Sequence, residues 1–143
     1  MPSRKAIDEF LAQKRIAVVG VCRNTKEFPN TVFRKLKETG HEVFPVNPHA
    51  EQLEGQPCYA SVKALPGPVD GVVVMLPPDK SVGVVRECQE AGIPRVWLYR
   101  DSKEAASLAR EGGVQVVASA CPHMFMGGGF PHNIHRWFTR IDP

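Results

Sequence analysis

The sequence predicts an α/β fold in which helices cover both faces of a doubly wound parallel sheet. Short apolar runs closed by glycine or proline alternate with amphipathic segments, which is the pattern of successive βαβ units. The chain has 143 residues, of which 43% are hydrophobic and 23% are charged, and these values suit one domain with one core. We therefore expect a single domain over residues 1–143.

Apolar runs define the expected strands of this sheet. The run GVVVML is the most apolar part of the chain and predicts a central strand that is buried on both faces. The first run, RIAVVG, closes on a glycine, which indicates a turn directly after the strand. The expected strands cover residues 15–20, 42–46, 71–76, 95–98 and 114–117, and a short further segment lies near residues 58–60.

Segments with apolar residues at helical spacing predict the helices. The N-terminal helix, within residues 1–14, is expected to pack against the body as a lid or a strut. Asp79 is the expected N-cap of the helix that follows the central strand. In the C-terminal tail, residues 123–143, Pro131 predicts the start of a short last helix. Before the tail, the expected helices cover residues 5–13, 29–39, 79–91 and 102–110.

Charge and composition exclude several classes of partner. Lysine and arginine exceed aspartate and glutamate by 18 − 15 = 3, and without a clustered basic face this excess does not indicate nucleic-acid binding. No apolar run approaches the roughly 18 residues of a membrane span, and the N-terminus lacks the apolar segment of a signal peptide. We expect a cytoplasmic protein without a membrane partner.

The cysteines are typical of reduced thiols in the cytosol. They lie far apart and form no CxxC pair, so their spacing supports neither a disulfide scaffold nor a zinc ribbon. Cys22 lies in the loop after the first strand, close to a helix start that favours a thiolate, but no histidine or acid can be placed beside it. Cys121 is interpreted as a small buried thiol. The four cysteines are Cys22, Cys58, Cys88 and Cys121.

The loop after the first strand is the strongest candidate for a binding site. Ligands of open parallel sheets bind beyond the carboxyl ends of the strands, and a helix N-terminus favours an anion there. Arg23 and Lys26 add positive charge to the loop, which begins at Gly20, so a phosphate or pyrophosphate is the expected ligand. The alternative is that Gly20 only permits a tight turn and that both cations are solvated.

Two features argue against NAD as that ligand. The dinucleotide fingerprint GxGxxG needs three glycines, whereas Cys22 and Thr25 stand where the second and third would fall. An acidic residue normally follows the second strand and binds the ribose hydroxyls, but here Asn47 follows the strand and His49 lies two residues further on. These two side chains are suited instead to a position near a further phosphate.

Several motifs together carry a family resemblance. VVGVCRNTKEFPN, HEVFPVNPHAEQLEGQPCYASV, VDGVVVMLPP and RVWL, with the late Cys121, resemble the small CoA-binding proteins built on the N-terminal domain of the succinyl-CoA synthetase alpha subunit. The most specific piece is PVNP followed seven residues later by GQPCYAS, and the match runs from about residue 14 to residue 122. The resemblance implies a Rossmann-like fold that binds coenzyme A (CoA).

The resemblance also implies which residues bind CoA. Its ADP end is expected to lie against the first loop and the end of the second strand, with residues at the end of the central strand bordering the nucleotide. The sequence departs from the family in two places. Many relatives carry Gln-x-Gly-Ile after the strand that corresponds to residues 95–98, whereas this chain reads LYRDS there. Relatives also often carry Asp-Arg-Cys late in the chain, whereas this chain reads SAC. The expected site residues are Gly20, Val21, Cys22, Arg23, Lys26, Asn47, Pro48, His49, Pro77, Pro78 and Ser81.

The resulting hypothesis is a stand-alone, non-catalytic module that binds CoA or an acyl-CoA. No catalytic residue and no metal site is assigned, and His123, His132 and His135 are interpreted as packing or surface groups. The main alternative is an NADP-binding or redox-sensing oxidoreductase domain in which Arg23, Lys26 and His49 hold the 2′-phosphate. A third is a partner subunit with a vestigial site. Trp137 and Phe138 offer a face for a homodimer.

Overall fold

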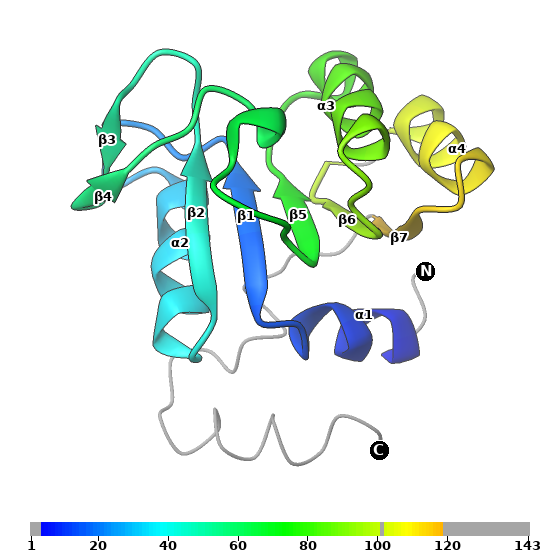
Figure 1. The fold of residues 1–143 in the computed structure, drawn as a ribbon, viewed down its shortest axis with the longest axis horizontal. Helices are drawn as coiled ribbons and strands as arrows, with labels where there is room; N and C mark the ends of the chain where they lie inside the picture. The colour runs from blue at the N-terminus through cyan, green and yellow to red at the C-terminus, as the bar shows by residue number, and fades with distance from the viewer. Residues whose placement is uncertain (1–3, 101, 119–143) are drawn as a thin grey trace.

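The computed structural model describes residues 4–100 and 102–118, and within them a parallel five-stranded sheet forms the centre of the molecule (Figure 1). The strand order is β2-β1-β5-β6-β7. From β1 the chain adds β2 on one side, and it then crosses over to add β5, β6 and β7 on the other side. The order therefore reverses between β1 and β5, where doubly wound folds bind their ligands. The strands are β1 (Arg15–Val19), β2 (Glu42–Val46), β5 (Gly71–Val74), β6 (Arg95–Leu98) and β7 (Gln115–Ala118).

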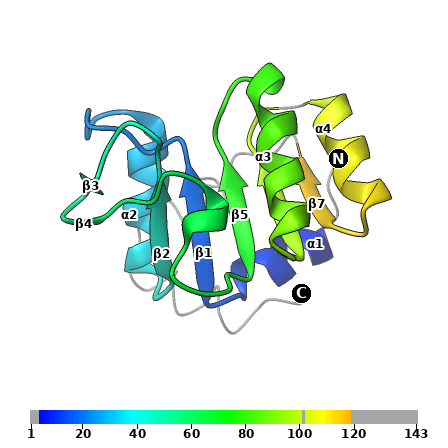
Figure 2. The ribbon, with the colours of Figure 1, turned by 45° about the horizontal axis from the view of Figure 1, so that its top comes forward.

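Helices cover both faces of the sheet, as the sequence predicts. Alternate side chains of each strand point to opposite faces. One set, which includes Ala17 and Val72, packs with α3 and α4, and the other set, which includes Ile16 and Val73, packs with α1 and α2. In Figure 2, α3 lies in front of the sheet and α2 lies behind it. The helices are α1 (Arg4–Leu11), α2 (Phe28–Glu38), α3 (Pro78–Glu90) and α4 (Lys103–Glu111).

The connection from β2 to β5 contains structure that the sequence did not indicate. Strands β3 (Gln52–Leu53) and β4 (Gln56–Pro57) form an antiparallel hairpin, and the 3-10 helix η1 (Val62–Ala64) follows. Between them, Tyr59 bridges to Val46 along the outer edge of β2. The segment near residues 58–60 therefore extends the sheet by a single bridge.

The start of α3 differs from the prediction, because Asp79 is not its N-cap. Pro77 occupies that position in an extended conformation (φ −56°, ψ 152°), and Pro78 is the first helical residue. The fixed φ of proline suits the first helical position. A backbone N–H at that position has no partner within the helix, so proline, which lacks the N–H, breaks no hydrogen bond there. Asp79 lies one residue further on, where its carboxylate complements the helix dipole.

The N-terminal helix α1 is a strut rather than a lid. Phe10 is 1% exposed and its ring meets Trp97 edge to face at a centroid distance of 5.3 Å. A hydrogen bond of 2.8 Å from Gln115 Nε2 to Glu9 Oε2 ties the helix to β7.

The C-terminal tail lies outside the described residues. No helix within the described ranges is both long and apolar enough to cross a membrane.

Candidate functional site

The turn after β1 requires glycine for two reasons. Gly20 has φ +120°, which side-chain-bearing residues rarely adopt. A Cβ atom built on it would lie 2.7 Å from the backbone oxygen of Met75, which belongs to the turn after β5. Glycine therefore lets the loops that follow β1 and β5 approach each other at the point where the strand order reverses.

Asn30 holds the rest of this loop in place. Its Oδ1 accepts a hydrogen bond of 3.0 Å from the Cys22 backbone N–H, and its Nδ2 donates to the Cys22 carbonyl at 2.7 Å. The same Nδ2 donates to Glu54 Oε2 at 2.7 Å. Asn30 is fully buried, so these bonds satisfy a polar group that would otherwise be costly to bury. Sequence analysis missed Asn30, although an amide just inside a helix start after an irregular loop is a signal for such a contact.

Asn47 links the loops that follow β1 and β2. Its Nδ2 donates to the carbonyl of Val21 at 3.0 Å, and its Oδ1 accepts from the backbone N–H of His49 at 2.8 Å. This neutral side chain occupies the position where dinucleotide-binding domains carry an acid for the ribose hydroxyls. Its amide is used to shape the loops, and it brings no negative charge to the strand ends.

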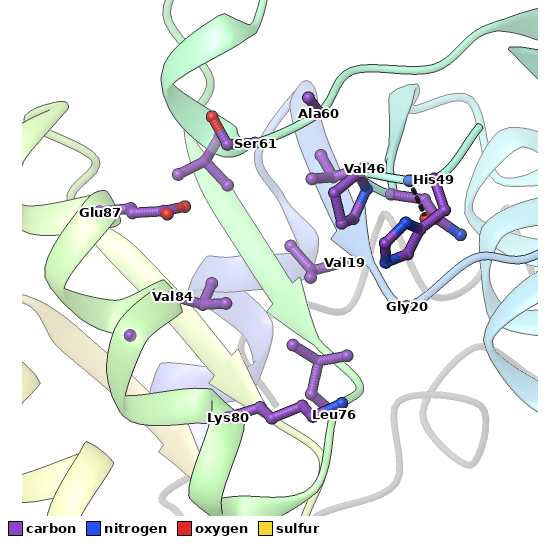
Figure 3. Close-up of a pocket in the computed structure, with 14 residues that line it drawn as sticks. Val19, Gly20, Val46, His49, Ala60, Ser61, Leu76, Lys80, Val84 and Glu87 are labelled. Atoms are coloured by element: carbon purple, nitrogen blue, oxygen red, sulfur yellow. Dashed lines mark hydrogen bonds between the residues drawn. The ribbon is translucent and has the colours of Figure 1, made fainter. Parts of the chain in front are cut away.

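A cavity of about 520 Å³ opens between the ends of β1 and β2 on one side and α3 on the other (Figure 3). Its walls are apolar over much of their area, as is typical of ligand cavities. The apolar walls come from Val19, Val46, Val62, Leu76 and Val84, and the polar side chains at its border are Asn47, His49, Ser61, Lys80 and Glu87. We call this space the first cavity.

A second, more open cavity of about 810 Å³ adjoins the first. The two share Pro48, His49 and Ala60, and the second also borders Arg23 and Cys58. The guanidinium Nη2 of Arg23 donates a hydrogen bond to the backbone oxygen of His49, which joins the loop after β1 to the loop after β2. A positive charge therefore lies beside His49, which borders both cavities.

The structure brings some of the expected site residues together and leaves others apart. Gly20, Asn47, Pro48 and His49 line the first cavity, and Arg23 lines the second with Pro48 and His49. The remaining expected residues line neither cavity: Val21, Cys22, Lys26, Pro77, Pro78 and Ser81.

Two of the residues outside the cavities lie in distinct surroundings. Ser81 is 1% exposed, and its hydroxyl donates to the carbonyl of Pro77 at 3.2 Å, so it bonds to its own helix. Lys26 is exposed in the loop after β1, and its backbone N–H donates to Asn24 Oδ1. The first cavity is also lined by Ser61, Lys80 and Glu87, which no sequence motif selects.

Burial makes two of the thiols poor nucleophiles. It raises the pKa of Cys88 to about 12, with a smaller contribution from the nearby carboxylate of Glu87. Burial also raises the pKa of Cys58, against the lowering effect of hydrogen bonds to the backbone at Asn47 and Tyr59. Cys22 is half-buried, with its Sγ 3.5 Å from Asn30 Oδ1.

The late cysteine and the histidines of the tail lie outside the described residues: Cys121, His123, His132 and His135. Within residues 4–100 and 102–118, no three His, Cys, Asp or Glu side chains gather as a metal site requires. Trp137 and Phe138, which sequence analysis offered as a homodimer face, are likewise outside the described ranges.

Comparisons with known proteins find relatives of similar length. The chain is 32% identical over 123 residues to the uncharacterized protein YneT of Bacillus subtilis, with 84% of this chain and 91% of that protein covered. A solved structure, a hypothetical protein from Pyrococcus horikoshii OT3, superposes with a TM-score of 0.80 at 31% identity and covers 87% of this chain and 92% of that one.

A longer relative is the alpha subunit of the ADP-forming acetate–CoA ligase II of Pyrococcus furiosus. It is 30% identical over 128 residues, which cover 80% of this chain but only 28% of the length of that subunit. The family model described as a CoA binding domain matches residues 14–126, a range that includes the whole sheet and both cavities. The resemblance drawn from the sequence motifs is thereby confirmed, and the chain belongs to the CoA-binding domain family.

Proposed function

We propose that this protein binds CoA or an acyl-CoA as a stand-alone, non-catalytic module. The observation that carries the proposal is the first cavity, a largely apolar space at the reversal of strand order, with Lys80 at its border and Arg23 in the adjoining second cavity. CoA offers an adenine ring for the apolar walls and phosphates for the charged border. The family and the acetate–CoA ligase relative support the same ligand.

The charges around the cavity support an anionic ligand with a neutral base. Lys80 lies at the edge of the first cavity near Leu76, and Arg23 lies in the second beside His49. Charge-assisted contacts to phosphate are among the stronger polar contacts in proteins. The amide of Asn47 stands where a carboxylate would repel a second phosphate, so the strand end tolerates more than one phosphate group.

An NADP-binding domain is the second candidate, and one observation favours it. Arg23 and His49 border the same cavity, where they would meet a 2′-phosphate as well as the 3′-phosphate of CoA. Lys26, the third residue of that hypothesis, lines neither cavity. The single glycine of the first loop also leaves less room for a dinucleotide than three glycines would.

Titration of the purified chain with CoA, NADP and NAD separates these candidates. We expect CoA to raise the melting temperature and to release measurable heat, while NAD at the same concentration does neither. At a ligand concentration of about 100 times Kd, the stabilisation is about 2.7 kcal/mol, which is readily seen in a melting curve. Equal or greater stabilisation by NADP would reject CoA in favour of the second candidate.

A further inference from the structure

The first cavity carries a positively charged side chain at one end and a negatively charged side chain at the other. Lys80 and Glu87 both lie on α3 and both line it, and Glu87 comes seven positions after Lys80. Seven residues are about two helical turns, or roughly 10 Å along the axis, so the two side chains share one face of the helix. Figure 3 shows Lys80 directed toward Leu76 at one end and Glu87 at the other end, on the side of Ser61.

The carboxylate of Glu87 is not satisfied by the part of the chain that the structure describes. It accepts no hydrogen bond and forms no ion pair there, although it is half-buried and faces the cavity. Its neighbour Glu90, one turn along α3, is by contrast exposed and paired with Lys63 at 2.7 Å. A half-buried carboxylate without a partner is unfavourable, so Glu87 is suited to a ligand that donates a hydrogen bond.

The neighbouring hydroxyl has the same character. Ser61 precedes η1, yet its side chain makes no capping hydrogen bond. Two polar groups that can accept hydrogen bonds therefore lie together at one end of a cavity with apolar walls. Phosphates are repelled from this end by Glu87 and attracted to the end with Lys80. The ligand therefore has a fixed direction, with its anionic part at Lys80 and a neutral part that carries N–H donors at Glu87.

We propose that Glu87 is a specificity-determining residue that accepts a hydrogen bond from the exocyclic amine of an adenine base. This inference rests on the proposed function, because adenine is the part of CoA that is both flat and neutral and carries an N–H donor at its rim. Glu87 then selects against purines that lack the amine, since binding them leaves its carboxylate buried and unpaired.

The test compares CoA with an analogue in which unsubstituted purine replaces adenine, so that only the amine is lost. Calorimetric titration of the wild-type chain is expected to show a preference for CoA of roughly tenfold or more, as a hydrogen bond to a charged group provides. In Glu87→Ala the two ligands should bind within about twofold of each other, because the partner of the amine is gone. Glu87→Gln keeps a neutral acceptor and should show an intermediate preference.

The control variant is Glu104→Ala, which removes an exposed carboxylate from α4 and should keep the full preference. A wild-type chain that binds both ligands equally, or a Glu87→Ala variant that keeps the wild-type preference, overturns the role of Glu87 while CoA binding itself stands. A wild-type chain that does not bind CoA overturns the proposed function and this inference with it. The wild-type comparison needs no variant to fold, so the absence of a preference there overturns the role of Glu87 even if Glu87→Ala does not fold.

Discussion

The amino ends of the strands and the first cavity use the same kinds of polar side chain in opposite ways. At the amino ends, Arg15 donates from its backbone to Asp70 at 3.0 Å and pairs with Glu42 at 3.1 Å. In the first cavity, the side chains of Lys80 and Glu87 form no hydrogen bond or ion pair with any described residue. Groups that satisfy one another stabilise the fold, whereas groups left without partners in a cavity are available to a ligand.

The largest effect should come from a matched pair of glycine substitutions. Gly20, at the first cavity, and Gly40, at the start of β2, both have positive φ, but a Cβ on Gly40 would meet no atom within 4 Å. Gly40→Ala should therefore lower the free energy of unfolding only by the cost of backbone strain, about 1–3 kcal/mol. Gly20→Ala adds a forced backbone shift of about 1–3 kcal/mol, because its Cβ meets the Met75 oxygen.

Chemical denaturation measures both losses, and CoA titration should show weaker binding for Gly20→Ala only. Equal stability of the two variants would show that the approach of the loops after β1 and β5 is not tight.

The second prediction concerns His41, which is buried at the amino ends of the strands. Its Nε2 lies 2.7 Å from the carbonyl oxygen of Leu11 and its Nδ1 lies 2.8 Å from Thr39 Oγ1. His41→Phe leaves these groups without their partner and should lower the free energy of unfolding by about 1–3 kcal/mol. CoA affinity should not change, because His41 lines neither cavity.

Ser61→Ala is the matched change at the first cavity, where a hydroxyl with no capping bond is removed. Its stability in urea should match the wild type. A loss as large as that of His41→Phe would contradict the division between structural and ligand-facing polar groups.

The third prediction separates the two cations of the loop after β1. Arg23 lines the second cavity and Lys26 lines neither, so Arg23→Ala should weaken CoA binding by roughly tenfold, the effect of one charge-assisted contact. Lys26→Ala should change it little. Comparing CoA with dephospho-CoA by calorimetry shows whether Arg23 meets the 3′-phosphate. Similar losses in both variants would mean that the whole loop rearranges around the ligand.

The smallest effect is expected at Cys22. Its Sγ lies 3.5 Å from both the Asn24 carbonyl oxygen and Asn30 Oδ1, and serine offers a hydroxyl donor of similar size there. Cys22→Ser should keep the fold and change CoA affinity by less than about threefold, because the thiol itself is a weak donor. A disulfide between Cys22 and the CoA thiol, found by mass spectrometry of the non-reduced protein and lost in Cys22→Ser, would overturn a purely binding role.

The fold follows from the sequence to a large extent. The strands at residues 42–46 and 95–98 have the predicted bounds, since buried parallel strands read as continuous apolar runs. The hairpin of β3 and β4 was not predicted because strands of two residues are too short to show an alternating pattern. The start of α3 was misplaced because an N-cap aspartate and a proline at the first helical position are competing signals.

At the site, local sequence patterns predict the cavity residues that directly follow a strand. Gly20 ends a buried strand, and Asn47 and His49 follow the next one, so a parallel sheet must bring them to the same edge. The presence of Ser61, Lys80 and Glu87 in the cavity lining, and the absence of Lys26 and Ser81 from it, emerge from the packing of the folded chain. These positions depend on how α3 packs beside η1 and on how Asn30 shapes the loop after β1, and no local sequence pattern records such contacts.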